Sequence, residues 1–102
     1  MQYKQASITK KANVYHDGKV SSRSIITAEG ETKTLGFMLE GNYTFNTQAA
    51  EIMEVLAGEC RVRLAGTQDW HSYNAGESFD VPANSSFDIE VSGILDYICH
   101  FA

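Results

Sequence analysis

The chain contains the sequence GNYTFNTQAAEIMEVLAG at residues 41–58, whose conformation determines whether the middle of the protein is helical or extended. Four apolar residues follow the helical spacing i, i+3, i+4 and i+7: Ala49, Ile52, Met53 and Leu56. Thr47 could cap such a helix and Gly58 could end it. In an extended chain, alternate residues from Thr47 to Val55 would instead share one face. Aromatic and β-branched residues at 43–45 favour this strand interpretation, so the local pattern is compatible with both conformations.

The rest of the chain has the pattern of short β-strands. Strand candidates are residues 20–26, 32–39, 60–64, 70–73, 78–81, 87–91 and 95–101, with Gly-, Asn- and Asp-containing turns between them. Pro82 marks a strand end, because proline cannot donate a hydrogen bond within a sheet. About nine or ten short strands with turns roughly every 8–12 residues predict an all-β sandwich or barrel.

Composition and charge restrict the class of protein. A length of 102 residues predicts one domain, and a hydrophobic share of 43% is ordinary for a packed globule. A formal net charge of −5 argues against binding to nucleic acid, which needs a basic surface. We find no apolar run typical of a membrane span or a secretory leader. Cys60 and Cys99 are expected to be buried free thiols, and we expect a cytoplasmic protein.

The N-terminal segment differs in composition from the rest of the chain. Residues 1–12 are polar and contain three lysines: Lys4, Lys10 and Lys11. They are predicted to form a flexible N-terminal arm, or else a poorly specified edge strand. Residues 13–102 are predicted to form the single domain.

Two segments resemble the sequence motifs of cupins. Glu51, followed by Gly58 and a second β-patterned segment, resembles the first motif, in which a ligand glutamate precedes a glycine turn. Gly76 and Pro82, separated by five residues, resemble the second, with Phe87 further on. The resemblance implies a cupin-like jelly-roll β-barrel with strand at residues 51–56 and Glu51 facing inward. Its interior would be lined by the odd-numbered residues of 43–55 and 79–91.

Within the cupins, the chain resembles the small pyrimidine/purine nucleoside phosphorylase family. The matching segments are residues 17–20, 43–47, 51–55, 69–70, 79–82 and 97–99, and the resemblance runs from about residue 13 to the C-terminus. It implies a glycosyltransferase that transfers a pentosyl group. Purine and pyrimidine nucleosides would react with inorganic phosphate to give free base and ribose 1-phosphate.

The residues that hold a metal in most cupins are missing. Those cupins use His-x-His and glutamate in the first motif and histidine in the second. Here Thr47, Gln48 and Ala49 precede Glu51, and Phe87 lies at the second-motif position. One carboxylate does not make a transition-metal site. His16, His71 and His100 lie in unrelated segments, so we expect no metal and no cofactor.

Phosphorolysis requires an anion site, groups that bind the ribose hydroxyls, and a wall against the base. The candidate phosphate ligands are Lys19, Arg61 and Arg63. Arg61 and Arg63 lie two residues apart on one face of a strand and could clamp an anion. An exposed basic stripe is the alternative interpretation of this pair.

The remaining candidate site residues follow from the family resemblance. Glu51 is the candidate catalytic residue, accepting hydrogen bonds from ribose and offsetting positive charge on the sugar. The candidate substrate-binding residues are Tyr43 and Thr47 as hydroxyl donors and Phe87 or Tyr97 as the stacking partner of the base. Plain core packing is the alternative for each aromatic residue. His100 should face away from Tyr97 and Cys99, and Trp70 is a candidate lid or interface residue.

Two other functions fit the same residues. One is a non-catalytic, metal-free cupin that binds a small metabolite, and the other is an interaction module. The expected partners are a nucleoside and phosphate, without nucleic acid or membrane. We also expect a homodimer, because a small domain with exposed edge strands has to cover them.

Overall fold

The computed structural model describes residues 2–101, and these are almost entirely β-structure. Nine strands and one short 3-10 helix lie within them: β1 (Ser7–Ile8), β2 (Asn13–Tyr15), η1 (His16–Gly18), β3 (Val20–Ile26), β4 (Thr32–Met38), β5 (Gly41–Asn46), β6 (Glu51–Leu64), β7 (His71–Asn74), β8 (Ser78–Val81) and β9 (Ser86–Phe101). All strand pairs are antiparallel. The prediction of an all-β fold is confirmed.

The undecided segment is extended. Glu51 begins β6, which pairs with β9 along one edge and with β8 and β7 along the other. These interstrand hydrogen bonds outweigh the helical spacing of the apolar residues, since tertiary contacts routinely override intrinsic propensity. Strand at residues 51–56 is therefore confirmed.

Two long strands connect the two layers of the fold. The first half of β9 pairs with β5 and its second half with β4, while β6 pairs with β8 and then with β7. Turns were predicted at Gly58 and, at Gly93, between the strand candidates 87–91 and 95–101. Both predictions are wrong, because Gly58 lies inside β6 and Gly93 inside β9. Gly58 has φ +90° next to two register shifts in β6, so a β-bulge bends the strand without ending it. A Cβ there would overlap the backbone oxygen of Ile94.

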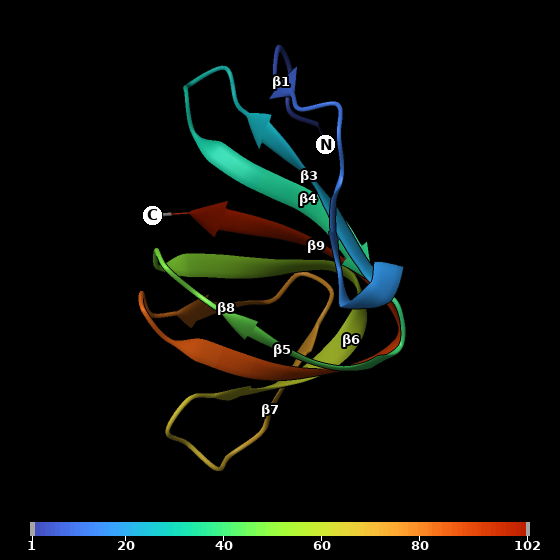
Figure 1. The fold of residues 1–102 in the computed structure, drawn as a ribbon, viewed down its shortest axis with the longest axis vertical. Coiled ribbons are helices and arrows are strands. Elements are labelled where there is room, and N and C mark those ends of the chain that lie inside the picture. Colours follow the sequence, from blue (N-terminus) through green and yellow to red (C-terminus); the bar gives the residue numbers. More distant parts are fainter. Residues whose placement is uncertain (1, 102) are drawn as a thin grey trace.

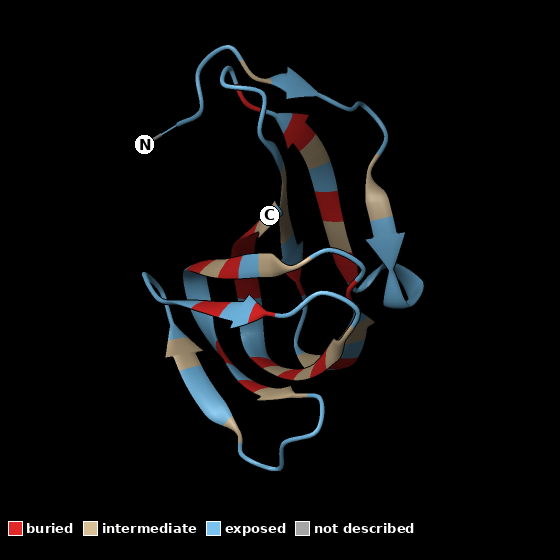
Figure 2. Ribbon diagram, turned by 90° about the vertical axis from the view of Figure 1, so that its left-hand side faces the viewer, coloured by how far each residue is buried: buried red, intermediate tan, exposed pale blue. Residues whose placement is uncertain are grey.

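The sheet curls around a common core. Figure 1 shows it passing from β3 and β4 at the top, through β9 and β6, to β7 at the bottom. Off this path, β5 pairs with β9 and β8 pairs with β6. This arrangement agrees with the predicted cupin-like jelly roll. Buried and exposed residues alternate along the central strands (Figure 2). The core contains most of the predicted odd-numbered positions: Tyr43, Met53, Val55, Phe79, Val81, Phe87, Ile89 and Val91.

Part of the N-terminal segment is attached to the sheet. Ser7 and Ile8 form β1 and pair with Ile26 and Ile25 of β3. Two residues of the predicted arm thus form an edge strand, and the boundary at residue 12 stays a prediction. Among residues 2–101, no helix has the length and apolar character needed to cross a membrane.

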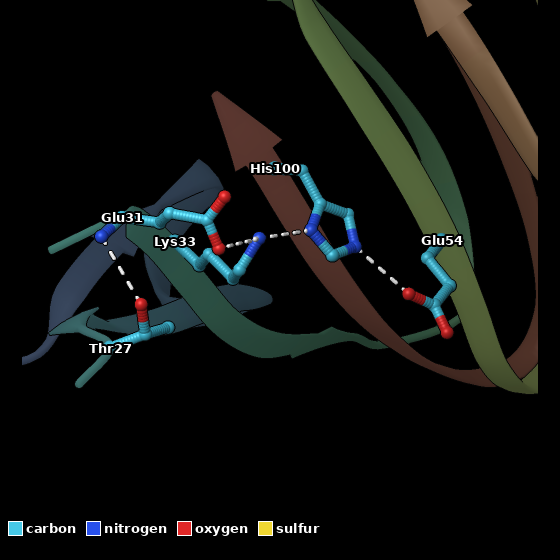
Figure 3. A network of polar contacts seen from close by, with 5 residues as sticks. All are labelled: Thr27, Glu31, Lys33, Glu54 and His100. Carbon is cyan, nitrogen blue, oxygen red and sulfur yellow. Dashed lines mark hydrogen bonds and ion pairs between the residues drawn. The ribbon is translucent and has the colours of Figure 1, made fainter. Parts of the chain in front are cut away.

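A polar network lies across the outer surface of β4, β9 and β6 (Figure 3). Lys33 Nζ lies 2.7 Å from Nδ1 of His100, and Nε2 of the same ring lies 2.8 Å from Oε1 of Glu54. Glu31 Oε1 lies 3.8 Å from Lys33 Nζ. His100 therefore faces away from Cys99 and the interior, as strand alternation predicts, and links three strands.

Candidate functional site

A cavity of about 540 Å³ lies between the two layers of the sheet. This volume is within the usual range of small-molecule sites, roughly 300–1,000 Å³. Its apolar wall includes Met38, Phe45, Met53 and Phe87. Its polar side chains include Ser22, Thr34, Glu51, Tyr97 and Cys99. The combination of an aromatic wall with a few convergent polar groups is typical of a ligand-binding site.

Glu51 faces this cavity from the first position of β6. Its Oε2 accepts a hydrogen bond from Cys99 Sγ at 3.2 Å. Burial raises the pKa of the Glu51 carboxyl above its ordinary value, and the hydrogen bond from Cys99 opposes this shift. Burial, together with the neighbouring charge of Glu51, raises the pKa of the Cys99 thiol, so the thiol stays protonated and remains a donor.

Tyr97 and Phe87, two of the predicted substrate-binding residues, line the cavity from β9. The Phe87 ring stacks on that of Phe45, with centroids 5.6 Å apart and an interplanar angle of 29°. The Tyr97 phenol is buried, and this burial raises its pKa above the ordinary value, which keeps the phenol neutral. A flat aromatic surface therefore lies in the same cavity as a neutral hydroxyl and a carboxylate.

The hydroxyls of Tyr43 and Thr47 bind backbone groups. Tyr43 lies in the core, and its hydroxyl donates to the carbonyl of Leu39 at 2.7 Å. Thr47 lines the cavity, but its Oγ1 donates to the carbonyl of Pro82 at 2.7 Å and accepts from the amide of Ser85 at 3.0 Å. Both hydroxyls thus hold neighbouring loops in place, and their predicted role as donors to ribose stays a prediction.

Arg61 and Arg63 lie side by side on the other surface of β6. Arg61 Nε donates to Glu90 at 2.9 Å, and Arg63 pairs with Asp88 at 2.8 Å. Both guanidinium groups lie over the ring of Trp70, at 5.2 and 4.8 Å from its centroid. The hydrogen bond from Arg63 holds the pKa of Asp88 below its ordinary value. The two arginines share one face as predicted, and each is paired with a carboxylate.

The third predicted phosphate ligand, Lys19, is exposed at the end of η1. In the part of the chain that the structure describes, no lysine or arginine side chain lines the Glu51 cavity. The phosphate-binding roles of Lys19, Arg61 and Arg63 therefore stay predictions, and the structure does not bring these residues together with Glu51.

Five polar residues of the cavity were absent from the sequence-based candidates: Ser22, Thr34, Asn46, Gln48 and Cys99. The sequence contains a signal for one of them, Ser22. Ser22 and Ser24 alternate along β3, and a strand with hydroxyls on its inward face indicates a polar cavity more than a packed core. As for metals, no group of three or more His, Cys, Asp or Glu side chains in residues 2–101 is arranged to hold an ion.

Comparisons with known proteins agree with this fold. The family model for pyrimidine/purine nucleoside phosphorylase matches residues 10–101. A protein of that name from Cupriavidus taiwanensis is 57% identical over 100 residues, which cover 98% of this chain and 95% of that protein. The solved structure of a protein of unknown function from Acinetobacter sp. ADP1 has a TM-score of 0.96 at 41% identity, covering 99% and 98% of the two chains.

A more distant structure shares the fold alone. The cupin domain of Drosophila melanogaster CENP-C has a TM-score of 0.69 at 11% identity, over 96% of this chain and 71% of that chain. Together with the match of the family model and the identity to its curated members, the geometry leads to one assignment. The chain belongs to the pyrimidine/purine nucleoside phosphorylase family and has a cupin-like fold.

Proposed function

We propose that this protein is a broad-specificity nucleoside phosphorylase, a glycosyltransferase that moves the pentosyl group of purine and pyrimidine nucleosides to inorganic phosphate. The observation that carries the proposal is the single carboxylate of Glu51 facing a cavity with an aromatic wall, in a chain of this family. The cavity has room for a nucleoside and an anion, and its aromatic surface accepts either class of base.

In the proposed reaction, the base stacks against Phe87 beside Phe45. A phosphate oxygen forms a bond to C1′ while the glycosidic bond breaks, and the electron pair of that bond leaves with the base. Hydrogen phosphate supplies the proton that the departing base takes up, so the products are ribose 1-phosphate and free base. The Glu51 carboxylate stabilises the positive charge that develops on the sugar.

The phosphate ligands have two candidate sources. Arg61 and Arg63 are already paired with Glu90 and Asp88, and their side chains lie outside the cavity. Asn46 and Gln48 line the cavity itself, and their side-chain amides are uncharged donors. We favour these amides, because an anion bound by them would be close to the bound nucleoside.

Phosphate dependence tests the function. Purified protein is incubated with uridine, inosine or adenosine with and without phosphate, and base is measured by chromatography and ribose 1-phosphate by 31P NMR. We expect base release only with phosphate. Release that is indifferent to phosphate would identify a hydrolase, and no release from any nucleoside would favour a binding protein. Arg61→Ala and Arg63→Ala, tested apart, should leave the KM for phosphate unchanged, whereas Asn46→Ala should raise it.

We also propose a homodimer. Besides the edge strands, the outer surface carries exposed apolar side chains that a second subunit could cover: Phe37, Ile52, Leu56 and Ile94. Light scattering at micromolar concentration should give twice the mass of the chain. A monomer mass under those conditions would contradict the proposal.

A further inference from the structure

Three neighbouring strands place a tyrosine and a serine on opposite sides of a glycine. In the register of the sheet, Ser22 of β3 is opposite Gly36 of β4, and Gly36 is opposite Tyr97 of β9. Ser22 and Tyr97 both line the cavity. A Cβ at Gly36 would lie 2.7 Å from that of Ser22. The missing side chain of Gly36 therefore lets β3 and β4 approach closely between Ser22 and Tyr97.

The hydrogen-bond donors around this pair can be counted. Asn13 Nδ2 donates to Ser22 Oγ at 3.2 Å and to Ser24 Oγ at 3.0 Å, which uses both protons of the amide. The hydroxyls of Ser22 and Tyr97 have two protons, and neither hydroxyl donates a hydrogen bond to a protein group among residues 2–101. Because Ser22 and Tyr97 are only 4% and 5% exposed, these protons are available to a molecule in the cavity.

The same cavity has an acceptor with spare capacity. Glu51 Oε2 accepts a hydrogen bond from the Cys99 thiol. Glu51 Oε1 has no hydrogen-bond donor within the described part of the chain. Glu51, Ser22 and Tyr97 line the same cavity. The cavity thus presents two hydroxyl donors and one free carboxylate acceptor.

We propose that Glu51 and the Ser22–Tyr97 pair form a subsite for a single sugar hydroxyl, which donates to Glu51 and accepts from the pair. An alcohol is the group of a nucleoside that donates and accepts through one atom. Phosphate is disfavoured at this position by the charge of the carboxylate. Asn13 and Gly36 are positioning residues, since they act through Ser22 and Tyr97. The inference rests on the proposed function, because it takes the nucleoside as the ligand.

The test removes one hydroxyl group from the protein and one from the substrate, separately and together. Wild type, Tyr97→Phe and Ser22→Ala are assayed with uridine and with 2′-, 3′- and 5′-deoxyuridine. Tyr73→Phe is the matched control, because that tyrosine contacts Phe79 outside the cavity. We expect wild type to lose about tenfold in kcat/KM with one deoxynucleoside, as is typical of a lost hydrogen bond near a charged group. Tyr97→Phe should lose a similar factor in kcat/KM with uridine. With that deoxynucleoside, kcat/KM of Tyr97→Phe should be little lower than that of wild type.

Two results would overturn the subsite: equal kcat/KM for uridine and all three deoxynucleosides, or an equal loss in Tyr97→Phe with every substrate. If wild type releases no base from uridine, the phosphorylase proposal fails, and the same set of nucleosides is then measured by calorimetric binding without phosphate. One deoxynucleoside should bind to wild type about tenfold more weakly than uridine does. Tyr97→Phe should bind that deoxynucleoside as tightly as wild type binds it. Equal binding of all four, or no detectable binding, would overturn the subsite independently of catalysis.

Discussion

The substitution Gly36→Ala tests the close approach of β3 and β4, which brings Ser22 and Tyr97 to either side of Gly36. The added Cβ would overlap the backbone oxygen of Ser21 and lie 2.7 Å from Ser22 Cβ and 2.8 Å from Ser22 Cα. Carbon atoms pack best at about 3.5–4.0 Å. The two strands must therefore separate locally by about 1 Å, within a ladder that pairs seven residues of each strand.

The size of the effect follows from two opposing terms. Overpacking costs about 1–3 kcal/mol, and a clash with backbone belongs at the upper end of that range. Alanine also lowers the conformational entropy of the unfolded chain. This stabilises the folded protein by about 0.4–1 kcal/mol, because Gly36 does not need a positive φ. The net loss of stability is about 2 kcal/mol. For a domain of this size, such a loss lowers Tm by about 8–16 °C.

Thermal unfolding followed by circular dichroism measures this shift. Gly66→Ala is the control, since it has φ +77° and no atom within 4 Å of the added Cβ. Its cost comes from the backbone alone and should be about 1 kcal/mol. If Gly36→Ala melts at the temperature of wild type or above it, β3 and β4 are not packed as closely at Gly36 as described.

Three further predictions concern titratable groups. Glu51→Gln should lower kcat/KM by about 10²–10³. Because burial raises the pKa of Glu51, the folded state holds this proton more tightly than the unfolded chain, so the charged carboxylate costs stability as pH rises above 4.5. Urea unfolding should find Glu51→Gln more stable than wild type at pH 7, with the difference gone near pH 4; a less stable variant at pH 7 would contradict this. For Asp88 the sign is opposite, since the bond from Arg63 lowers its pKa. Asp88→Asn should cause a small loss of stability at pH 7 that shrinks as the pH falls below 3.8, the ordinary pKa of the carboxyl, and a loss that stays constant on acidification would argue against the ion pair. Finally, His100→Ala removes two contacts across the outer network and should cost about 1–2 kcal/mol in urea unfolding, whereas an unchanged midpoint would show that these contacts contribute nothing.

Much of the fold is encoded locally. Alternation at residues 87–91, turn residues between short apolar runs and Pro82 at a strand end all predicted β-structure, and they did so because each depends only on neighbours in the sequence. The spacing of Glu51, Gly58, Gly76 and Pro82 also led to the family. The same local signals placed β8 at residues 78–81, where the structure has it.

Strand continuity was decided by partners distant in the sequence. Residues 51–58 fit helix and strand equally well until β9, far along the chain, supplied hydrogen bonds to β6. Gly58 and Gly93 carry ordinary turn signals. They lie at an irregularity of the β6–β9 pairing and not in turns, because β6 and β9 bend at the same place, where the backbone of Ile94 passes close to Gly58.

The candidate site shows the same division. Alternation determined that Arg61 and Arg63 share a face, but it contains no information on which face is the inner one. That choice followed from the register of β6 with β9, which sets the arginines opposite Glu90 and Asp88 on the outer surface and leaves the inward side to apolar residues. Likewise, the row of Ser22, Gly36 and Tyr97 exists only where three strands meet. Side-chain period is a property of one strand, whereas a cavity is made by several strands whose pairing is settled by the packing of the whole chain.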